Sequence, residues 1–189
     1  MTGTKIKSFI LKNKIIDFTS TIIEGKRIVL QSRLNNFTET IFHEFSKEIT
    51  RFMYPKPADK IDETLEFINN SINNMKTNSE LILAITKKYN SEFLGCCGLH
   101  IKETPDTPEL GIWLKKSAHG NKYGQEAIKT LIDWCKENIE FDYLIYPVDK
   151  KNIPSRKIPE SLGGTIFREE IVKTMNNTYL DEVIYKISK

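Results

Sequence analysis

The residues best suited to chemistry in this 189-residue chain surround one loop, His119-Gly120-Asn121-Lys122-Tyr123-Gly124. Residues 109–114 before the loop read as a strand, and residues 125–139 after it repeat apolar side chains at helical spacing. Glycines allow a ligand close to the backbone, and the first N–H groups of a helix lack intrahelical partners. This segment therefore predicts an anion site suited to phosphate or pyrophosphate. An ordinary strand-to-helix connection is the alternative, because neither the Walker pattern nor the dinucleotide fingerprint is complete.

The cysteines, histidines and net charge exclude several other classes of protein. Cys96, Cys97 and Cys135 lie on an expected strand and on a helix face, so we expect buried, reduced thiols and a cytoplasmic protein. A nucleophilic Cys96 or Cys97 is the alternative, and no spacing suits a metal. A net charge of +3 without a basic run argues against nucleic acid. We see no membrane-spanning run or signal peptide, so no membrane association is expected.

The length of the chain suits one domain with a substantial core. Residues 1–24 are basic with scattered apolar pairs, and we interpret them as an N-terminal arm on a domain over residues 25–189. Apolar periodicity predicts the following elements. Helices are expected over residues 36–49, 61–75, 125–139 and 152–163, and strands over 26–31, 80–86, 92–101, 109–114, 143–148, 165–173 and 179–187. This order indicates an α/β fold of the α+β type with a mixed sheet.

Five short segments, in this order and spacing, resemble the GNAT N-acetyltransferase superfamily. They are Arg27-Ile28-Val29-Leu30, Phe93-Leu94-Gly95 with Gly98-Leu99-His100, Glu109-Leu110-Gly111-Ile112-Trp113-Leu114, the loop from Gly120 to Ala127, and Asn152-Ile153-Pro154-Ser155 with Leu162-Gly163. The likeness covers residues 25–187 and is greatest to the RimJ/RimL-like branch, the ribosomal-protein N-terminal acetyltransferases. It implies a mostly antiparallel central sheet of about seven strands flanked by about four helices.

The resemblance implies acetyl-CoA as co-substrate, with no metal. The backbone of His119, Gly120, Asn121, Lys122, Tyr123 and Gly124 would hold its pyrophosphate, and Ile112, Trp113 and Leu114 its pantetheine arm. Asn152 would form a hydrogen bond to the pantetheine, and Ser155 would protonate the departing thiolate. Asn152 before Pro154 is also an ordinary helix cap, and both roles are compatible.

The chain departs from the family's loop pattern at His119 and at Lys122, which replaces a glycine. We expect Lys122 to adopt a right-handed helical conformation without strain and to reach a phosphate with its ammonium group.

For the acceptor side, the resemblance makes Glu109 the candidate general base for an amine proton. A solvated strand-end glutamate is the alternative, and Glu103 or Asp106 would be the substitutes. Phe52 and Tyr54 belong to the loop beside the acceptor in this family, so they are expected to bind the substrate.

The function expected is acetyl-CoA-dependent N-acetyl transfer to a primary amine by direct attack in a ternary complex, with a protein or peptide N-terminus favoured. A polyamine or amino sugar is the alternative acceptor. A CoA-binding module without turnover is the other alternative, which the lysine at position 122 keeps open. The expected partners are acetyl-CoA and the amine, and a homodimer stays open.

Overall fold

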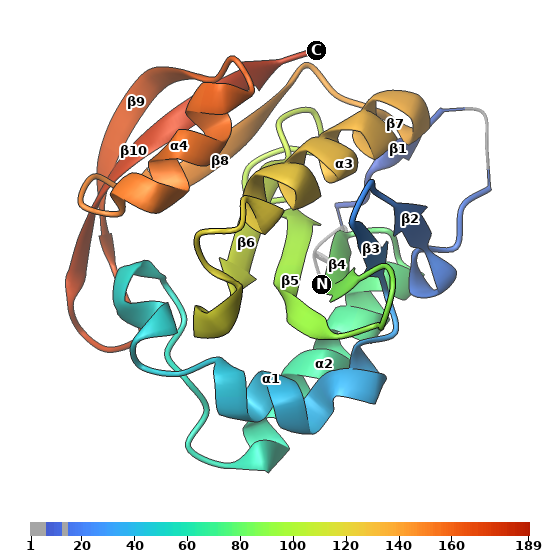
Figure 1. Ribbon diagram of the computed structural model, residues 1–189. Coiled ribbons are helices and arrows are strands. Elements are labelled where there is room, and N and C mark those ends of the chain that lie inside the picture. The colour runs from blue at the N-terminus through green and yellow to red at the C-terminus, as the bar shows by residue number, and fades with distance from the viewer. Residues whose placement is uncertain (1–6, 13–14) are drawn as a thin grey trace, which may run out of the picture.

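An eight-stranded sheet organises the computed structural model, which describes residues 7–12 and 15–189 (Figure 1). The strands, in spatial order, are β2 (Ile22–Glu24), β3 (Ile28–Gln31), β4 (Glu80–Lys87), β5 (Phe93–His100), β6 (Glu109–Leu114), β8 (Tyr143–Asp149), β10 (Tyr179–Ser188) and β9 (Thr165–Lys173). Neighbours are antiparallel except for the parallel pair of β6 and β8. The expected fold class is confirmed. The sheet exceeds the expected seven strands because β2, inside the predicted arm, extends its edge.

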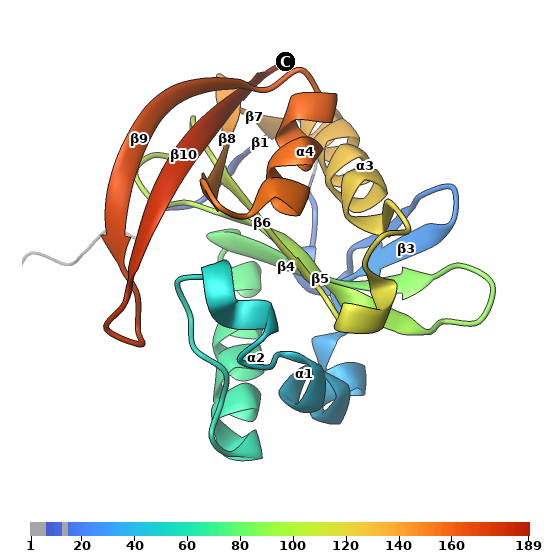
Figure 2. The same cartoon turned by 60° about the vertical axis from the view of Figure 1, so that its left-hand side comes forward.

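Helices cover both faces of the sheet (Figure 2). They are α1 (Thr38–Glu44), α2 (Ile61–Lys76), α3 (Tyr123–Asn138) and α4 (Ile153–Ser161). The helices α1 and α2 pack on one face, and the apolar stripe of α3 packs on the other together with α4. Strand residues alternate between these two layers because successive side chains point to opposite faces. On β6, for example, Leu110 joins the α3 layer and Trp113 contacts the α1 layer.

The helix predicted over residues 36–49 is shorter in the structure. A 3-10 turn over Leu34–Phe37 precedes α1, and a separate 3-10 turn, η3, covers Ile49–Phe52. Phe45 leaves the helical conformation at φ −79° and ψ 64°, and its ring packs 5.0 Å from that of Trp113. The helix thus ends at Glu44, where the chain turns the Phe45 ring onto Trp113, and the prediction over residues 45–49 is wrong.

The parallel pair of β6 and β8 is short. Glu109 lies opposite Ile145, and the Ile145 N–H donates to the carbonyl of Pro108 at 2.9 Å. This is the single register pair of the two strands among the described residues. Strand β8 instead pairs with β10 along its whole length, from Tyr143 to Asp149, and β6 pairs with β5. The carboxyl ends of β6 and β8 therefore diverge, directly before α3 and α4 begin.

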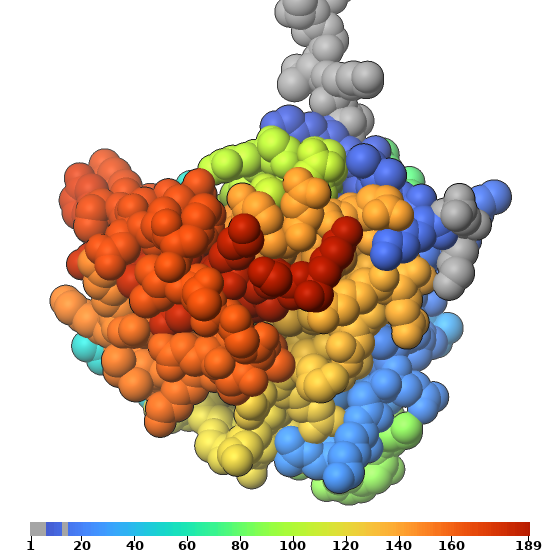
Figure 3. Space-filling view, turned by 90° about the horizontal axis from the view of Figure 1, so that it is seen from above, coloured from blue at the N-terminus to red at the C-terminus, as the bar shows by residue number. Residues whose placement is uncertain are grey.

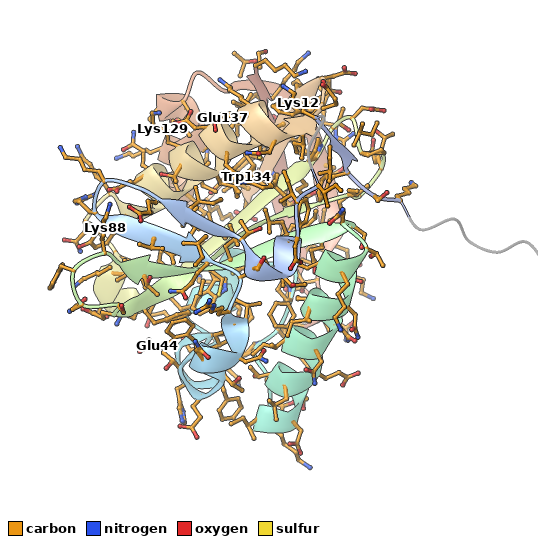
Figure 4. All side chains as sticks on the ribbon, turned by 90° about the vertical axis from the view of Figure 1, so that its right-hand side faces the viewer. Lys12, Glu44, Lys88, Lys129, Trp134 and Glu137 are labelled. Atoms are coloured by element: carbon orange, nitrogen blue, oxygen red, sulfur yellow. The ribbon has the colours of Figure 1, made fainter. Side chains whose placement is uncertain are left out.

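The N-terminal segment packs on the domain where the structure describes it; residues 1–6 and 13–14 of the predicted arm lie outside the described residues. The short strand β1 (Ile10–Leu11) pairs with β7 (Ile139–Glu140), beyond the end of α3 (Figure 1). In the space-filling view, blue atoms of the N-terminal segment lie against orange atoms of the body (Figure 3). Phe18 is 1% exposed, and its ring meets that of Trp134 edge-on at 5.7 Å. Trp134 lies on the side of α3 that faces this segment (Figure 4).

We expect Phe18→Ala to lower the free energy of unfolding by about 3–5 kcal/mol, because it removes a buried aromatic ring and leaves a cavity. Ile15→Ala is the matched control: Ile15 belongs to the same segment but is fully exposed, and its loss should change stability by less than about 0.5 kcal/mol. Urea unfolding of both variants measures the difference. Equal stability of the two variants would show that the segment does not pack on the domain in solution.

Candidate active site

The loop before α3 presents free backbone donors. Gly120 and Lys122 have positive φ values of 77° and 61°. In the described part of the chain, no backbone carbonyl accepts a hydrogen bond from the N–H of Gly120, Asn121 or Lys122. Tyr123 and Gly124 form the first helical turn, where N–H groups have no intrahelical acceptor. Successive donors at a helix start form a concave arrangement that fits a phosphate or pyrophosphate.

Lys122 does not have the right-handed conformation expected of it. It is the N-cap of α3, with φ 61° and ψ 16° in the left-handed region. The chain reverses between the 3-10 turn η4 (Lys116–Ala118) and α3, and this reversal requires a positive φ at the cap. Glycine adopts such a conformation freely, whereas a side chain there costs about 1–2 kcal/mol. Lys122 thus keeps the backbone shape that glycine favours, with an exposed side chain.

Arg27, from the turn between β2 and β3, fixes the start of α3. Its Nε atom lies 2.7 Å from Oε2 of Glu126, and its Nη1 donates to the Asn121 carbonyl at 3.1 Å. The guanidinium group also lies 4.7 Å from the ring centroid of Tyr123. Burial raises the pKa of Glu126, but the hydrogen bonds and charge of Arg27 outweigh burial and hold this pKa below its usual value. Arg27 therefore holds the loop against the first turn of α3 through an ion pair and a hydrogen bond.

Two loop side chains bond back to the main chain. The Nε2 atom of His119 lies 2.9 Å from the carbonyl oxygen of Leu114, at the end of β6. The amide of Asn121 donates to the His119 carbonyl at 2.9 Å. These side chains therefore brace the loop, while its backbone N–H groups stay free for a ligand.

The start of α4 lies across the diverging strands from this loop. Asn152 caps the helix, its side-chain oxygen accepting the N–H of Ser155 at 3.4 Å. The Ser155 hydroxyl lies 2.8 Å from that of Tyr146, a residue of β8 that the sequence did not single out. Tyr146 is 2% exposed, and burial raises the pKa of its phenol. The phenol therefore stays protonated and can donate to Ser155, whose own proton is then free for a departing sulfur.

Gly124 brings the two helices close to β6. A β-carbon on Gly124 would lie 3.1 Å from Cδ1 of Ile158 on α4, and 3.5 Å and 3.6 Å from the side chains of Leu114 and Ile112. The small residue thus lets α3, α4 and the expected pantetheine-binding strand meet at one point. The Trp113 side chain points to the opposite face, among the aromatic rings of Phe45 and Phe93.

Glu109 lies at the start of β6, with 16% of its side chain exposed and Lys102 Nζ 3.4 Å from its carboxylate. Lys102 also lies 5.9 Å from the ring centroid of Tyr54, whose carbonyl accepts the N–H of Met175 at 3.1 Å. The structure therefore brings Glu109, Lys102 and Tyr54 together beside the β9–β10 hairpin. Phe52 is half-buried, and Arg51 lies over its ring at 5.1 Å.

The two predicted substitutes for Glu109 are engaged differently. Glu103 accepts a hydrogen bond from Arg168 at 3.0 Å, and its side chain is largely exposed. Asp106 is exposed, and its backbone carbonyl accepts the N–H of Asp142 at 2.7 Å. Glu109 remains the more enclosed carboxylate of the three.

Glu182 on β10 is a titratable residue that sequence reasoning missed. Burial, reinforced by the negative charges of Glu109 and Glu170, raises its pKa to about 7. Val183 and Tyr185 face the α3 layer, so Glu182 faces the same side of the sheet as Glu109 and Trp113. The sequence held a signal for it: Glu182 is a charged residue at an inward position between Leu180 and Ile184, both buried.

The three cysteines are buried and form no disulfide. Burial raises the pKa of the Cys96, Cys97 and Cys135 thiols far above neutral, so they stay protonated and are poor nucleophiles. Within residues 7–12 and 15–189, no group of three or more His, Cys, Asp or Glu is placed to hold a metal ion. No helix in the same ranges is both long and apolar enough to cross a membrane.

A solvent-open hollow of about 460 Å³ lies elsewhere, between the β2–β3 turn and α3. Its lining includes Gly25, Lys129, Trp134 and Glu137, the last three labelled in Figure 4. None of the predicted site residues lines this hollow.

Comparison with solved structures shows the same fold in known acetyltransferases. An acetyltransferase of Salmonella typhimurium that modifies the N-terminal serine of a 50S ribosomal subunit protein superposes with a TM-score of 0.76, at 14% identity over 89% of this chain and 99% of that one. The Microcin C7 self-immunity acetyltransferase MccE, solved with acetyl-CoA and AMP, has a TM-score of 0.73 at 21% identity, over 87% and 93% of the two chains. At these identities the likeness establishes the fold alone.

Sequence comparison identifies the family. The uncharacterized N-acetyltransferase p20 of Bacillus licheniformis is 26% identical over 118 residues, which are 61% of this chain and 66% of that protein. The family model described as Acetyltransferase (GNAT) domain matches residues 33–165, from the turn before α1 to the start of β9. Because this match covers more than half of the chain, the chain belongs to the GNAT family of acetyltransferases.

Proposed function

We propose that the protein transfers the acetyl group of acetyl-CoA to a primary amine, in a complex that holds both substrates at once. The observation that carries the proposal is that α3 and α4 both begin beyond the diverging ends of β6 and β8, with Gly124 of α3 packed against Ile158 of α4. The start of α3 presents the free N–H groups of Gly120 to Gly124, and the start of α4 presents Ser155. If the pyrophosphate of acetyl-CoA binds at the start of α3 and its thioester at the start of α4, the pantetheine arm between them would run along Ile112 to Leu114.

The chemistry assigned to this arrangement is direct attack. The amine must lose a proton, its lone pair attacks the thioester carbonyl, and the C–S bond breaks as the tetrahedral intermediate collapses. Glu109, directly or through water, draws the proton from the ammonium group. Ser155, with Tyr146 behind it, supplies a proton to the thiolate, and Asn152 positions the donor. Of the two protons that the nitrogen loses, one is balanced by the thiol and one enters solvent.

The acceptor proposed is the N-terminus of a protein or peptide. Glu109 gives the acceptor side negative charge, which suits an ammonium group, and Glu182 adds to this charge as the pH rises above about 7. The Salmonella typhimurium neighbour acts on such an N-terminus. A polyamine or amino sugar shares the cationic charge and is the second candidate. Tyr54 is 51% exposed and lies beside Lys102. We propose that Tyr54, with Phe52 on the same loop, contacts the part of the acceptor beyond its reacting amine.

Acetyl-CoA should protect the fold against heat. At a free concentration of 100 times the dissociation constant, binding adds about 2.7 kcal/mol of stability. For a chain of this length, the melting temperature should rise by roughly 5–10 °C. Acetyl-pantetheine, which lacks the pyrophosphate, is the matched ligand and should protect much less. Equal shifts from the two ligands would show that the loop does not bind the pyrophosphate of acetyl-CoA. No shift from either ligand would contradict the proposed function.

Glu109→Gln should lower turnover roughly 10²–10⁴-fold at neutral pH without weakening acetyl-CoA binding, because it removes the charge that draws the amine's proton. The deficit should shrink at high pH, where the amine loses its proton unaided. Thiol release from acetyl-CoA, measured against N-terminal peptides and polyamines, gives both rates.

Ser155→Ala is the comparison variant for Glu109→Gln. Its loss should respond less to pH, since its role concerns the leaving thiolate rather than the amine. Wild-type rates in both variants would show that these residues are structural only.

Lys122→Gly should raise the Michaelis constant for acetyl-CoA about fivefold and leave the saturated rate nearly unchanged, because an exposed ion pair contributes up to ~1 kcal/mol. The increase should fade at high salt, which screens charge. Lys122→Ala separates charge from backbone shape: it removes the ammonium group but keeps a β-carbon in the left-handed conformation. Tighter binding of acetyl-CoA by Lys122→Gly than by the wild type at low salt would show that the lysine side chain obstructs the ligand more than its charge attracts it.

A further inference from the structure

A carboxylate, an imidazole and a second carboxylate lie side by side across three strands. Glu80 of β4 is opposite His100 of β5, and His100 is opposite Glu109 of β6. Directly opposed residues of antiparallel strands project to the same face, with β-carbons about 4.5–5.5 Å apart. This is the face of Trp113 and α1, where Lys102 and Tyr54 also lie. The row therefore adjoins the proposed acceptor site.

The imidazole of His100 has a defined orientation. Its Nδ1 atom lies 2.8 Å from Oε1 of Glu80, whose other oxygen accepts the Asn74 amide at 3.4 Å. Burial raises the pKa of Glu80, but the hydrogen bond from His100, together with its charge when the ring is protonated, lowers this pKa below its usual value. A carboxylate only accepts hydrogen bonds, so in the neutral ring Nδ1 carries the proton and Nε2 keeps its lone pair.

The free nitrogen faces β6. A β-carbon on Gly111 would lie 3.2 Å from Nε2 of His100, so the ring lies over Gly111, two residues beyond Glu109 on β6. The His100 side chain is 32% exposed and that of Glu80 is 17% exposed. A nitrogen base held by a carboxylate, with its lone pair toward a substrate-binding strand and a route to water, has the features of a proton acceptor.

We propose that His100, oriented by Glu80, is a second proton acceptor of the acceptor site and takes the proton that Glu109 draws from the amine. The inference rests on the proposed function. The N–H bond of the ammonium group breaks, its proton passes by way of Glu109 or a water to Nε2, and the nitrogen lone pair attacks the thioester. The imidazolium then releases this proton to solvent, while the second amine proton goes to the thiolate.

A glutamate alone is poorly matched to this task. An imidazole nitrogen is a stronger base than a carboxylate oxygen, so an imidazole beside the glutamate gives the proton a better acceptor. Other charged groups face the row as well. Lys102 pairs with Glu109, and Glu182 faces the same layer from β10. From α2, the contacts to Glu80 are the neutral side chains of Asn74 and Ser71.

The test compares His100→Gln, Glu80→Gln and the wild type on an amine that the wild type acetylates, between pH 6 and pH 10. His100→Gln should lower kcat/KM roughly 10²-fold near pH 7, with the deficit shrinking as the amine deprotonates. Glu80→Gln should lose roughly tenfold, because it disorients the ring and leaves the base in place. His43→Gln, an exposed histidine of α1 outside the site, is the matched control and should retain full activity.

A rescue experiment separates proton transfer from a structural role. Added imidazole should restore part of the activity of His100→Ala and leave the wild type unchanged. The acetyl-CoA melting shift should stay normal in every variant, which shows that each one folds and binds the donor.

Wild-type rates in His100→Gln would overturn the inference. A loss that is equal at every pH and is not relieved by imidazole would overturn it too, by making His100 structural. Absence of thiol release by the wild type with every amine would instead refute the proposed function itself, before any variant is compared.

Discussion

One short parallel contact governs the architecture. Strands β6 and β8 meet at Glu109 and Ile145, and beyond this point each follows its own antiparallel neighbour, β5 or β10. The two halves of the sheet separate because these antiparallel pairs are long and the parallel pair is not. The divergence deprives one edge of β6 of a strand partner. The unpaired backbone N–H and C=O groups on that edge need hydrogen-bond partners, and the extended pantetheine arm of the proposed donor can supply them.

The same divergence brings two helix starts together. Because α3 follows β6 and α4 follows β8, both N-termini lie where the strands part. Gly124 lets the first turn of α3 reach Ile158 of α4, and a larger residue would hold the helices apart. Arg27 holds one helix start through Glu126, and Tyr146 supports the other through Ser155. The proposed donor site therefore depends on the sheet and on both helices.

Strand register assembles the proposed acceptor side. Glu80 and His100 are 20 residues apart in the sequence and Glu109 follows on the next strand, yet the antiparallel ladder sets the three in a row on one face. Glu182 comes from the other half of the sheet, and its raised pKa reflects burial and the charge of Glu109. Such a concentration of perturbed and paired ionisable groups is typical of catalytic sites.

The sequence by itself determined the fold class, the order of the elements, the loop before α3 and the cap at Asn152. These features depend on apolar periodicity, glycine and local capping, which act over a few residues. It did not determine the edge strand β2, the end of α1 before Phe45 or the left-handed Lys122. Nor did it reveal the partners Tyr146, Glu182 and the pair of His100 with Glu80. Only the tertiary structure decided these, because strand register and packing between distant segments set which side chains meet and how far water is excluded from them.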